Sequence, residues 1–263
     1  MRHNNGHEGD AVPQPGARRL QRAWYRLTLG RWLLDMERAQ LAELLPNLFG
    51  YHALQIGSLT DADLLASSRI THRVVLVSEL EGTGTIIPGA YSRPDALPVA
   101  TDSVDVVLLA HTLEFESDPH GVLREAERVL IPEGHVVILG FNPWSLWGLW
   151  RLVLMRRGRP PWCGRFLSLL RIKDWLALLG FEVVTQRAFF FRPPLRQPGV
   201  MQRLGFMETW GARTWPAWGG AYLIVAKKRV ATLTPIKPRW ESARRLVTAR
   251  MPEASAGQMS HDD

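Results

Sequence analysis

Three residues that could contact a ligand follow short apolar runs typical of buried strands. Gly57 follows the first run, Asp95 lies between Pro94 and Pro98, and His111 follows a longer apolar run. In an open α/β sheet, ligands bind at the carboxyl ends of the strands. The positions of Gly57, Asp95 and His111 therefore predict one ligand-binding edge.

The chemistry available at each position is different. Gly57 allows close approach of the backbone to a ligand, and a helix starting after it would offer free N–H groups. The carboxylate of Asp95 could accept a hydrogen bond from an exocyclic amine such as adenine N6. His111 has an ordinary pKa that suits a general base near neutral pH. Taken singly, each residue also fits a structural role, as a turn glycine, a turn or capping acid and a structural histidine.

The elements that must position these residues alternate between strands and helices. Apolar residues recur every three to four positions over 17–49, which predicts one helix. Runs of β-branched and apolar residues predict strands at His52–Ile56, Arg73–Val77, Thr85–Ile87, Val104–Leu109, Gly134–Phe141, Phe181–Phe191 and Ala221–Lys228. Further helices are expected at Asp61–Ser68, Asp118–Leu130 and Arg165–Leu179, the last ended by Gly180. Such alternation indicates an α/β fold with a mostly parallel sheet covered on both faces.

Composition excludes several protein classes. The chain has 263 residues, 46% of them hydrophobic, which is ordinary for a packed core and argues against a wholly disordered protein. Cys163 is the single cysteine, so a disulfide scaffold is excluded and a reduced, cytoplasmic protein is expected. Residues 1–16 are polar without a secretory signal pattern, and the apolar window 143–155 is too short to span a bilayer.

The net charge of +7 is concentrated in two segments. Residues 151–173 have seven basic residues and no acid, and residues 227–250 have eight basic residues and one acid. We expect a disordered N-terminus over 1–16, one domain over 17–229 with an aromatic and basic insertion at 142–173, and a basic, mostly disordered tail over 230–263. Basic segments can bind phosphates or anionic lipid. Because no zinc-finger spacing or RNA-recognition motif is present, we expect neither an obligate nucleic-acid partner nor a metal.

The stretch from Asp95-Ala-Leu-Pro through Asp102-Ser-Val-Asp-Val-Val-Leu-Leu-Ala-His-Thr-Leu-Glu-Phe to Leu-Ile-Pro-Glu-Gly134 resembles the class I S-adenosylmethionine-dependent methyltransferases, in particular their type 11 group. The resemblance is clear over Tyr51–Phe141 and extends to Lys173–Lys228. It implies a Rossmann-like sheet of seven mostly parallel strands with helices on both faces, the last strand being antiparallel. It also implies that S-adenosylmethionine lies across the carboxyl ends of the first four strands.

By motif position, the resemblance also implies which residues contact this cofactor. Gly57, flanked by Gln55 and Ser58, would approach the methionyl and ribose part. Ser78 or Glu79 would face the ribose hydroxyls, Asp95 with Ala96 would contact adenine, and His111 would lie near the reacting atoms. Two departures from the family pattern occur here: Gln55 replaces an acid, and the two glycines that usually follow Gly57 are absent.

The methyl acceptor is expected to bind near Asn142, Trp144 and Trp147. With Trp150, these tryptophans are three residues apart, so on a helix they would roughly share one face. That face could pack onto the sheet, or it could form an aromatic lid over a flat or apolar acceptor. Arginines in 151–173 would suit an anionic acceptor or an anionic membrane surface, and the basic tail offers a second candidate for membrane contact.

Three functions remain open from the sequence. The leading hypothesis is a methyltransferase acting on a small-molecule acceptor, with His111 as the one candidate for a general base. The second is a binding or regulatory protein that kept the fold and lost turnover, as the missing glycines suggest. The third is a nucleic-acid methyltransferase, although Ala110-His-Thr-Leu113 lacks the Asn/Asp-Pro-Pro-aromatic tetrad of the amino-methylating DNA enzymes.

Overall fold

A computed structural model describes residues 16–57, 63–78, 89–154, 161–195 and 197–229. Contacts within the chain divide it into two units, Met1–Val230 and Ala231–Asp263, and every described residue belongs to the first unit. The disorder predicted for the N-terminus and for the 230–263 tail therefore falls outside the described residues, apart from Gly16. The strand predicted at Thr85–Ile87 also falls outside them.

The described residues form a seven-stranded sheet with the order β3-β2-β1-β4-β5-β7-β6. The strands are β1 (His52–Ile56), β2 (His72–Val77), β3 (Ala90–Tyr91), β4 (Val104–Ala110), β5 (Leu130–Phe141), β6 (Phe181–Phe189) and β7 (Ala221–Lys228). Strand β7 runs antiparallel to both of its neighbours, and the pairs among β1–β5 are parallel. The predicted α/β sheet with an antiparallel last strand is confirmed.

The central strands are mostly apolar because both faces of the sheet are covered. In β4, Val107, Leu108 and Leu109 are completely buried. Strand β5 begins earlier than predicted, at Leu130, which pairs with Val104. The register then shifts before the regular part of β5, so Leu-Ile-Pro-Glu-Gly134 forms an irregularity inside the strand.

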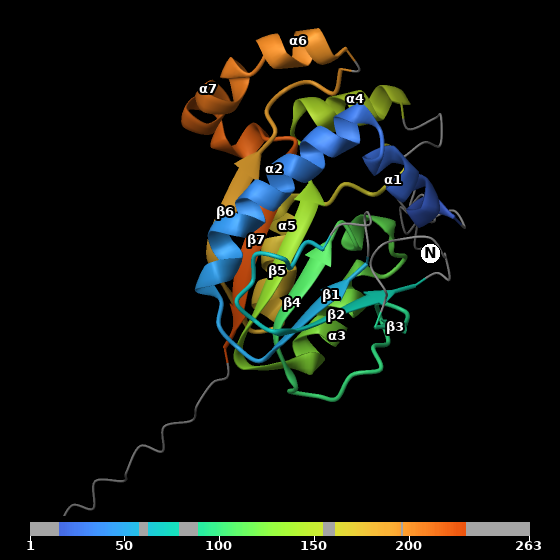
Figure 1. Ribbon diagram of the computed structural model, residues 1–263, viewed down its shortest axis with the longest axis vertical. Helices are drawn as coiled ribbons and strands as arrows, with labels where there is room; N and C mark the ends of the chain where they lie inside the picture. The colour runs from blue at the N-terminus through green and yellow to red at the C-terminus, as the bar shows by residue number, and fades with distance from the viewer. Residues whose placement is uncertain (1–15, 58–62, 79–88, 155–160, 196, 230–263) are drawn as a thin grey trace, which may run out of the picture. The chain divides into compact units, whose positions relative to one another are not determined.

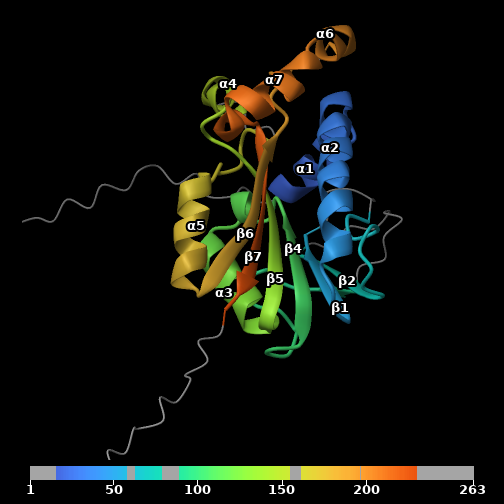
Figure 2. The same cartoon turned by 90° about the vertical axis from the view of Figure 1, so that its left-hand side faces the viewer.

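Helices cover the two faces of the sheet in pairs. Figure 2 shows α1 (Ala17–Tyr25) and α2 (Thr28–Leu44) on one face, with α3 (Pro119–Val129) and α5 (Leu169–Leu178) on the other. The start of α3 is capped by Asp118, whose carboxylate accepts from the Gly121 amide at 2.9 Å. The end of α5 is followed by Gly180 at φ 78°, as predicted for a helix C-terminus.

Two helix predictions were wrong. The helix expected over 17–49 is broken into α1, α2 and a 3-10 turn, η1 (Leu45–Asn47). The break lets α1 cross α2 so closely that a Cβ atom at Gly30 would lie 2.4 Å from the Trp24 carbonyl oxygen. Periodicity continues through such a break because both helices bury apolar residues. In the predicted helix Asp61–Ser68, the described residues form turns instead.

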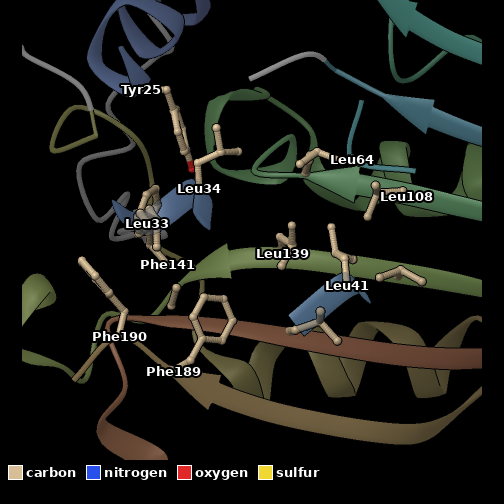
Figure 3. Packing of buried hydrophobic residues seen from close by; sticks show 14 of the residues in the cluster. Tyr25, Leu33, Leu34, Leu41, Leu64, Leu108, Leu139, Phe141, Phe189 and Phe190 are labelled. Carbon is tan, nitrogen blue, oxygen red and sulfur yellow. The ribbon is translucent and has the colours of Figure 1, made fainter. Parts of the chain in front are cut away.

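The larger core cluster lies between α1, α2 and the sheet (Figure 3). Leu33 and Leu41 of α2 pack with Leu108 of β4 and Leu139 of β5, and all four are at most 1% exposed. Burial of each such side chain contributes about 1.5–3 kcal/mol. A second cluster packs α3 and α5 against the opposite face. Together, these clusters hold the carboxyl ends of β1 and β4 rigidly beside each other.

The remaining helices gather at the end of the sheet where the parallel strands finish, as Figures 1 and 2 both show. They are η2 (Leu113–Phe115), α4 (Leu146–Leu154), α6 (Pro198–Arg203), α7 (Phe206–Thr214) and η4 (Pro216–Trp218). Among the described residues, no helix has the length and apolar character needed to cross a bilayer.

Candidate functional site

Gly57 lies at the carboxyl end of β1 with φ 84°, a conformation that favours glycine. Its amide donates a hydrogen bond to the Leu76 carbonyl at 2.9 Å, which ties the end of β1 to β2. A Cβ atom here would lie 3.0 Å from Thr112 Oγ1 and 3.5 Å from Arg18 Nη1. Residues from β1, β4 and α1 therefore meet at Gly57.

Gln55 is fully buried just before this glycine. Its Nε2 atom donates to the Gly57 carbonyl at 2.9 Å, which leaves Oε1 as the free acceptor of the amide. Within the described residues, Oε1 has no hydrogen-bond partner. A buried acceptor left unpaired costs about 1–3 kcal/mol, which a ligand donor such as an ammonium group would recover. Ser58, the other predicted neighbour of Gly57, lies outside the described residues.

Arg18 of α1 is a site residue that the sequence did not suggest. Its guanidinium pairs with the carboxylate of Glu116, which follows η2, and both side chains are largely buried, at 15% and 19% exposed. This ion pair fastens α1 over the carboxyl ends of β1 and β4. It also leaves a fixed positive charge beside the backbone of Gly57.

Asp95 lies in a turn that follows β3. The Ser92 amide bonds to the Val77 carbonyl at 2.9 Å, so this turn is joined to the end of β2. Asp95 accepts two hydrogen bonds from Arg93, at 2.9 and 2.6 Å. A carboxylate has about four acceptor sites, so it can still accept from an adenine amine. The Ala96 amide already donates to the Arg93 carbonyl at 3.1 Å.

The structure describes some of the predicted cofactor contacts at the ends of β2 and β3 and not others. Asp95 keeps acceptor capacity, whereas Ala96 can offer a ligand its methyl group but not its amide. Ser78, at the end of β2, is partly exposed, and Glu79 lies outside the described residues. The contacts of Asp95 and Ala96 with adenine stay predictions.

His111 is completely buried at the end of β4, and its φ of 48° is unusual for a residue other than glycine. Its Nε2 atom lies 2.8 Å from Glu37 Oε1, and its Nδ1 atom lies 3.1 Å from Glu114 Oε1. Tyr25 donates its hydroxyl to the same Glu37 oxygen at 3.1 Å, and the Phe141 amide donates to Glu114 Oε1 at 2.8 Å. Every ring nitrogen of His111 is therefore engaged by a carboxylate.

These contacts set the charge of the group. Burial by itself would lower the pKa of His111, but the carboxylates of Glu114 and Glu37 outweigh it and raise the pKa to about 10. Burial, together with Glu37, raises the pKa of Tyr25 well above its usual value. Because an imidazolium has no lone pair to accept a proton, this arrangement does not support His111 as a general base.

Sequence reasoning missed Glu37 and Glu114, although a signal for Glu37 existed. Glu37 lies four residues from Leu33 and from Leu41, so all three occupy the same buried face of α2. A carboxylate on a core face demands a buried partner. That partner is His111, which is distant in the sequence and could be identified only in the folded chain.

The predicted aromatic face of Trp144, Trp147 and Trp150 does not exist as one face. Trp147 is fully buried, stacks on Phe141 with ring centroids 5.8 Å apart, and donates from Nε1 to the Arg192 carbonyl at 2.9 Å. Trp144 precedes α4 and is 74% exposed, and Trp150 is 40% exposed. A spacing of three falls short of a helical turn by about 60°, and Trp144 lies outside the helix. Trp147 is therefore a core residue.

Asn142 connects two loops at the end of the sheet. Its Nδ2 atom donates to the carbonyls of Ala217 and Gly219, at 2.7 and 3.1 Å, and its Oδ1 atom accepts from the Trp144 amide at 3.0 Å. With these contacts, Asn142 positions the start of α4 against η4. Its predicted contact with an acceptor is not tested by this arrangement.

A separate pocket opens at the β6 edge of the sheet. It lies between α2, β6 and η4 and is lined by residues that include Gln40, Arg187 and Ala217. Gly57 and His111 directly follow β1 and β4, which lie on the other side of β5 and β7 in the sheet order. This pocket is therefore distinct from the predicted cofactor edge.

Comparison with known proteins gives a consistent result. Residues 78–138 match a methyltransferase domain family. The uncharacterized protein YafS of Escherichia coli (strain K12) is 37% identical over 216 residues, which cover 81% of this chain and 84% of that protein. An uncharacterized protein of Mycobacterium tuberculosis is 32% identical over 187 residues, which cover 65% of this chain and 61% of that protein.

Solved structures share the fold at low sequence identity. A SAM-dependent methyltransferase from Thermotoga maritima has a TM-score of 0.55 and 17% identity, covering 79% of this chain and 93% of that one. A SAM-dependent methyltransferase from Archaeoglobus fulgidus has a TM-score of 0.51 and 18% identity, covering 74% and 94%. At these identities the similarity concerns the fold.

Proposed function

The chain belongs to the class I S-adenosylmethionine-dependent methyltransferases, and we propose that it transfers the methyl group of this cofactor to a small-molecule acceptor. The observation that carries the proposal is the Oε1 atom of Gln55, which is buried beside Gly57 and has no hydrogen-bond partner among the described residues. It fits the cofactor because the amino-acid end of S-adenosylmethionine brings an ammonium donor.

The surroundings of Gly57 match both charges of that amino-acid end. The ammonium would donate to Gln55 Oε1, and the carboxylate would pair with the guanidinium of Arg18, which lies 3.5 Å from the Cβ position of Gly57. A guanidinium presents a planar array of donors that suits a carboxylate. Because Glu116 already holds Arg18 in place, little side-chain entropy would be lost on binding.

The acidic side chains of Glu37 and Glu114 beside His111 favour a cationic cofactor over a neutral one. Thr112, next to His111 in the chain, donates its hydroxyl to the Ile56 carbonyl at 2.7 Å, which places this group close to the end of β1. Charges separated by low-dielectric protein interact more strongly than in water. The site would therefore hold the sulfonium form more tightly than the uncharged thioether product.

When bound, the cofactor would supply a methyl group on a sulfonium: an acceptor atom attacks the methyl carbon, and the sulfur leaves as an uncharged thioether. The protein's part is to align the two reactants and exclude water, so no covalent nucleophile is required. A base is needed only where the acceptor must lose a proton. Since His111 is protonated in this arrangement, the site suits acceptors whose attacking atom has a free lone pair at neutral pH.

A binding or regulatory protein without turnover is the second candidate. Gln55 offers the ammonium a neutral oxygen, which makes a weaker hydrogen bond than a carboxylate would. Asp95 is likewise engaged by Arg93 before any ligand binds. Both features favour a lower cofactor affinity than the complete family motif would provide.

Calorimetric titration with S-adenosylmethionine and S-adenosylhomocysteine tests the proposal. Gln55→Met removes the acceptor oxygen while keeping the side-chain length, and we expect it to weaken binding of both ligands about tenfold, the value of one hydrogen bond to a charged donor. Gln186→Met, at an exposed position of β6, is the matched control and should bind like the unaltered protein. Arg18→Gln should cause a similar loss through the cofactor carboxylate.

The outcomes separate the two candidates. No heat with either ligand up to millimolar concentration would refute the cofactor assignment. Equal binding by Gln55→Met and the unaltered protein would refute the role of Gln55. Tight binding without methyl transfer to any member of a broad acceptor panel would support the binding protein over the enzyme.

A further inference from the structure

Large apolar side chains gather in the solvent at the end of the sheet where α4, α7 and η4 lie. We define this aromatic face by its exposed residues, which are Trp144, Leu149, Trp150, Leu152, Val153, Phe206, Trp210, Trp215 and Trp218. We propose that the aromatic face binds the interface of an anionic lipid bilayer. The inference concerns binding of the protein alone, so it does not rest on the proposed methyl transfer.

The residues of the aromatic face are held together by the fold. Figures 1 and 2 place α4 and α7 at the same end of the sheet. Asn142 bonds to the Trp144 amide and to the Ala217 carbonyl, so it joins the start of α4 to η4. The rings of Trp215 and Trp218 lie 6.3 Å apart. The face is therefore a fixed structure that spans two segments distant in the sequence.

The exposed apolar area is large for a monomer. Trp144, Trp210, Trp215 and Trp218 are 74%, 69%, 64% and 58% exposed. With about 250 Å² of surface per tryptophan, these four rings leave on the order of 600 Å² in water. Exposed apolar area of this extent at one end of the molecule is characteristic of interaction surfaces.

Helix α4 has the structure of an interfacial helix. Trp147 and Gly148 are buried against the domain, whereas Leu149, Leu152 and Val153 point into solvent. The helix is anchored by Trp147, whose Nε1 atom bonds to Arg192. A short helix with its outer face apolar can lie in the headgroup region, where tryptophan is enriched because its ring is apolar and its N–H is polar.

The charge around the aromatic face favours anionic lipid. Residues 134–173 contain no acid. In 198–218 the acid is Glu208, which is neutralised by Arg192 at 3.1 Å. Arg203 and Arg213 are exposed, and in the described part of the chain neither has an ion-pair partner. Exposed arginines beside tryptophans complement an anionic headgroup layer, at about 1 kcal/mol each.

From the sequence, we expect membrane contact through residues 151–173 or through the basic tail. The aromatic face is a different and larger proposed surface. The proposed contact includes the last turn of α4 within 151–173 and adds α7 and η4, which the sequence did not connect to it. Residues 155–160 and the tail lie outside the described residues. If the aromatic face binds the bilayer, binding depends on the exposed tryptophans. If the basic tail binds it instead, binding does not depend on them.

Co-sedimentation with vesicles tests the proposal on the full-length protein without cofactor. The probes are vesicles of phosphatidylcholine alone and vesicles with equal parts of phosphatidylglycerol and phosphatidylcholine. We expect binding to the anionic vesicles to be stronger and to weaken with salt. A tryptophan ring that buries roughly 60 Å² of apolar surface in the bilayer raises the partition coefficient about tenfold. The triple variant Trp210→Ser/Trp215→Ser/Trp218→Ser should therefore lose about a factor of ten for each ring. Arg203→Gln/Arg213→Gln should reduce the preference for anionic lipid about tenfold or more.

The matched control is Phe49→Ser/Tyr51→Ser, which removes two exposed aromatic rings just before β1, at the opposite end of the strands. This variant should bind vesicles like the unaltered protein. Circular dichroism spectra of each variant show whether it is folded, so that a loss of vesicle binding can be distinguished from unfolding. Three results would overturn the proposal. The unaltered protein could fail to sediment with vesicles, or the triple tryptophan variant could bind them as well as the unaltered protein does. The third is that the unaltered protein self-associates without binding vesicles and the triple variant is a monomer.

Discussion

Replacing His111 should destabilise the protein more than replacing either of the acids that hold it. His111→Gln removes the positive charge between the Glu37 and Glu114 oxygens, which lie 2.8 and 3.1 Å from the ring nitrogens. Both carboxylates are at most 1% exposed, so neither can be solvated in the variant. Loss of the partner of a buried charge costs about 3–5 kcal/mol. Raising the pKa of His111 from 6.5 to about 10 corresponds to a similar stabilisation, on the order of 5 kcal/mol.

Glu37→Gln is the matched variant and should cost far less, about 1 kcal/mol. Its amide oxygen can still accept from Tyr25 and from the His111 ring, and the remaining imidazolium and Glu114 carboxylate form a neutral pair. The double variant should be less destabilised than the sum of the two single variants, because removing Glu37 relieves the repulsion that His111→Gln creates. The expected coupling is about 1–3 kcal/mol.

Urea unfolding followed by circular dichroism measures these differences. At neutral pH, His111→Gln should lower the free energy of unfolding by about 3–5 kcal/mol, and the melting temperature by roughly 10 °C. The reasoning is refuted if His111→Gln is as stable as the unaltered protein, or if Glu37→Gln is the more damaging change.

The unaltered protein should show the corresponding pH dependence. The pKa of His111 is higher in the folded chain, at about 10, than its ordinary value of 6.5. Protonation therefore stabilises the folded state fully below pH 6.5, and this contribution is lost as the pH rises through about 10. Stability of His111→Gln should lack this decline, and an equal decline in both proteins would contradict the assignment of a charged ring.

Two further changes test the positions of the strand ends. Gly57→Ala should lower the free energy of unfolding by about 1–2 kcal/mol and weaken S-adenosylmethionine binding, because φ is 84° and the new Cβ would lie 3.0 Å from Thr112 Oγ1. Urea unfolding measures the first effect and calorimetric titration the second. Unchanged values in both measurements would contradict the prediction. Lys228→Met should cost about 2–4 kcal/mol in urea unfolding, since Nζ donates to Asp102 and to the Leu130 carbonyl, at 2.9 and 2.8 Å, from a largely buried position. A loss below 1 kcal/mol in that variant, about the value of one ordinary hydrogen bond, would show that these contacts contribute little.

Local patterns were sufficient to predict six of the seven strands that the structure describes, whereas β3 (Ala90–Tyr91) was not predicted. Strand β7 was predicted at the residues where it occurs, and β4 was placed to within one residue, because an uninterrupted apolar run between turn residues is compatible with few other structures. The antiparallel last strand came from the resemblance to a known family, not from the residues of β7. Helix ends were predicted less well. The break between α1 and α2 has no proline or glycine at the joint itself and depends on how closely Gly30 approaches Trp24.

The sequence by itself determined the fold class, the family and the candidate positions Gln55, Gly57 and His111, because strand patterns and motif spacing are local properties of the chain. Only the tertiary structure decided which atoms of these residues remain available. Among the described residues, Gln55 keeps an oxygen without a hydrogen-bond partner, whereas both nitrogens of His111 are occupied by Glu37 and Glu114. The reason is physical: ionisation and hydrogen bonding depend on burial and on partners that come from distant segments, and these are brought together only when the chain folds.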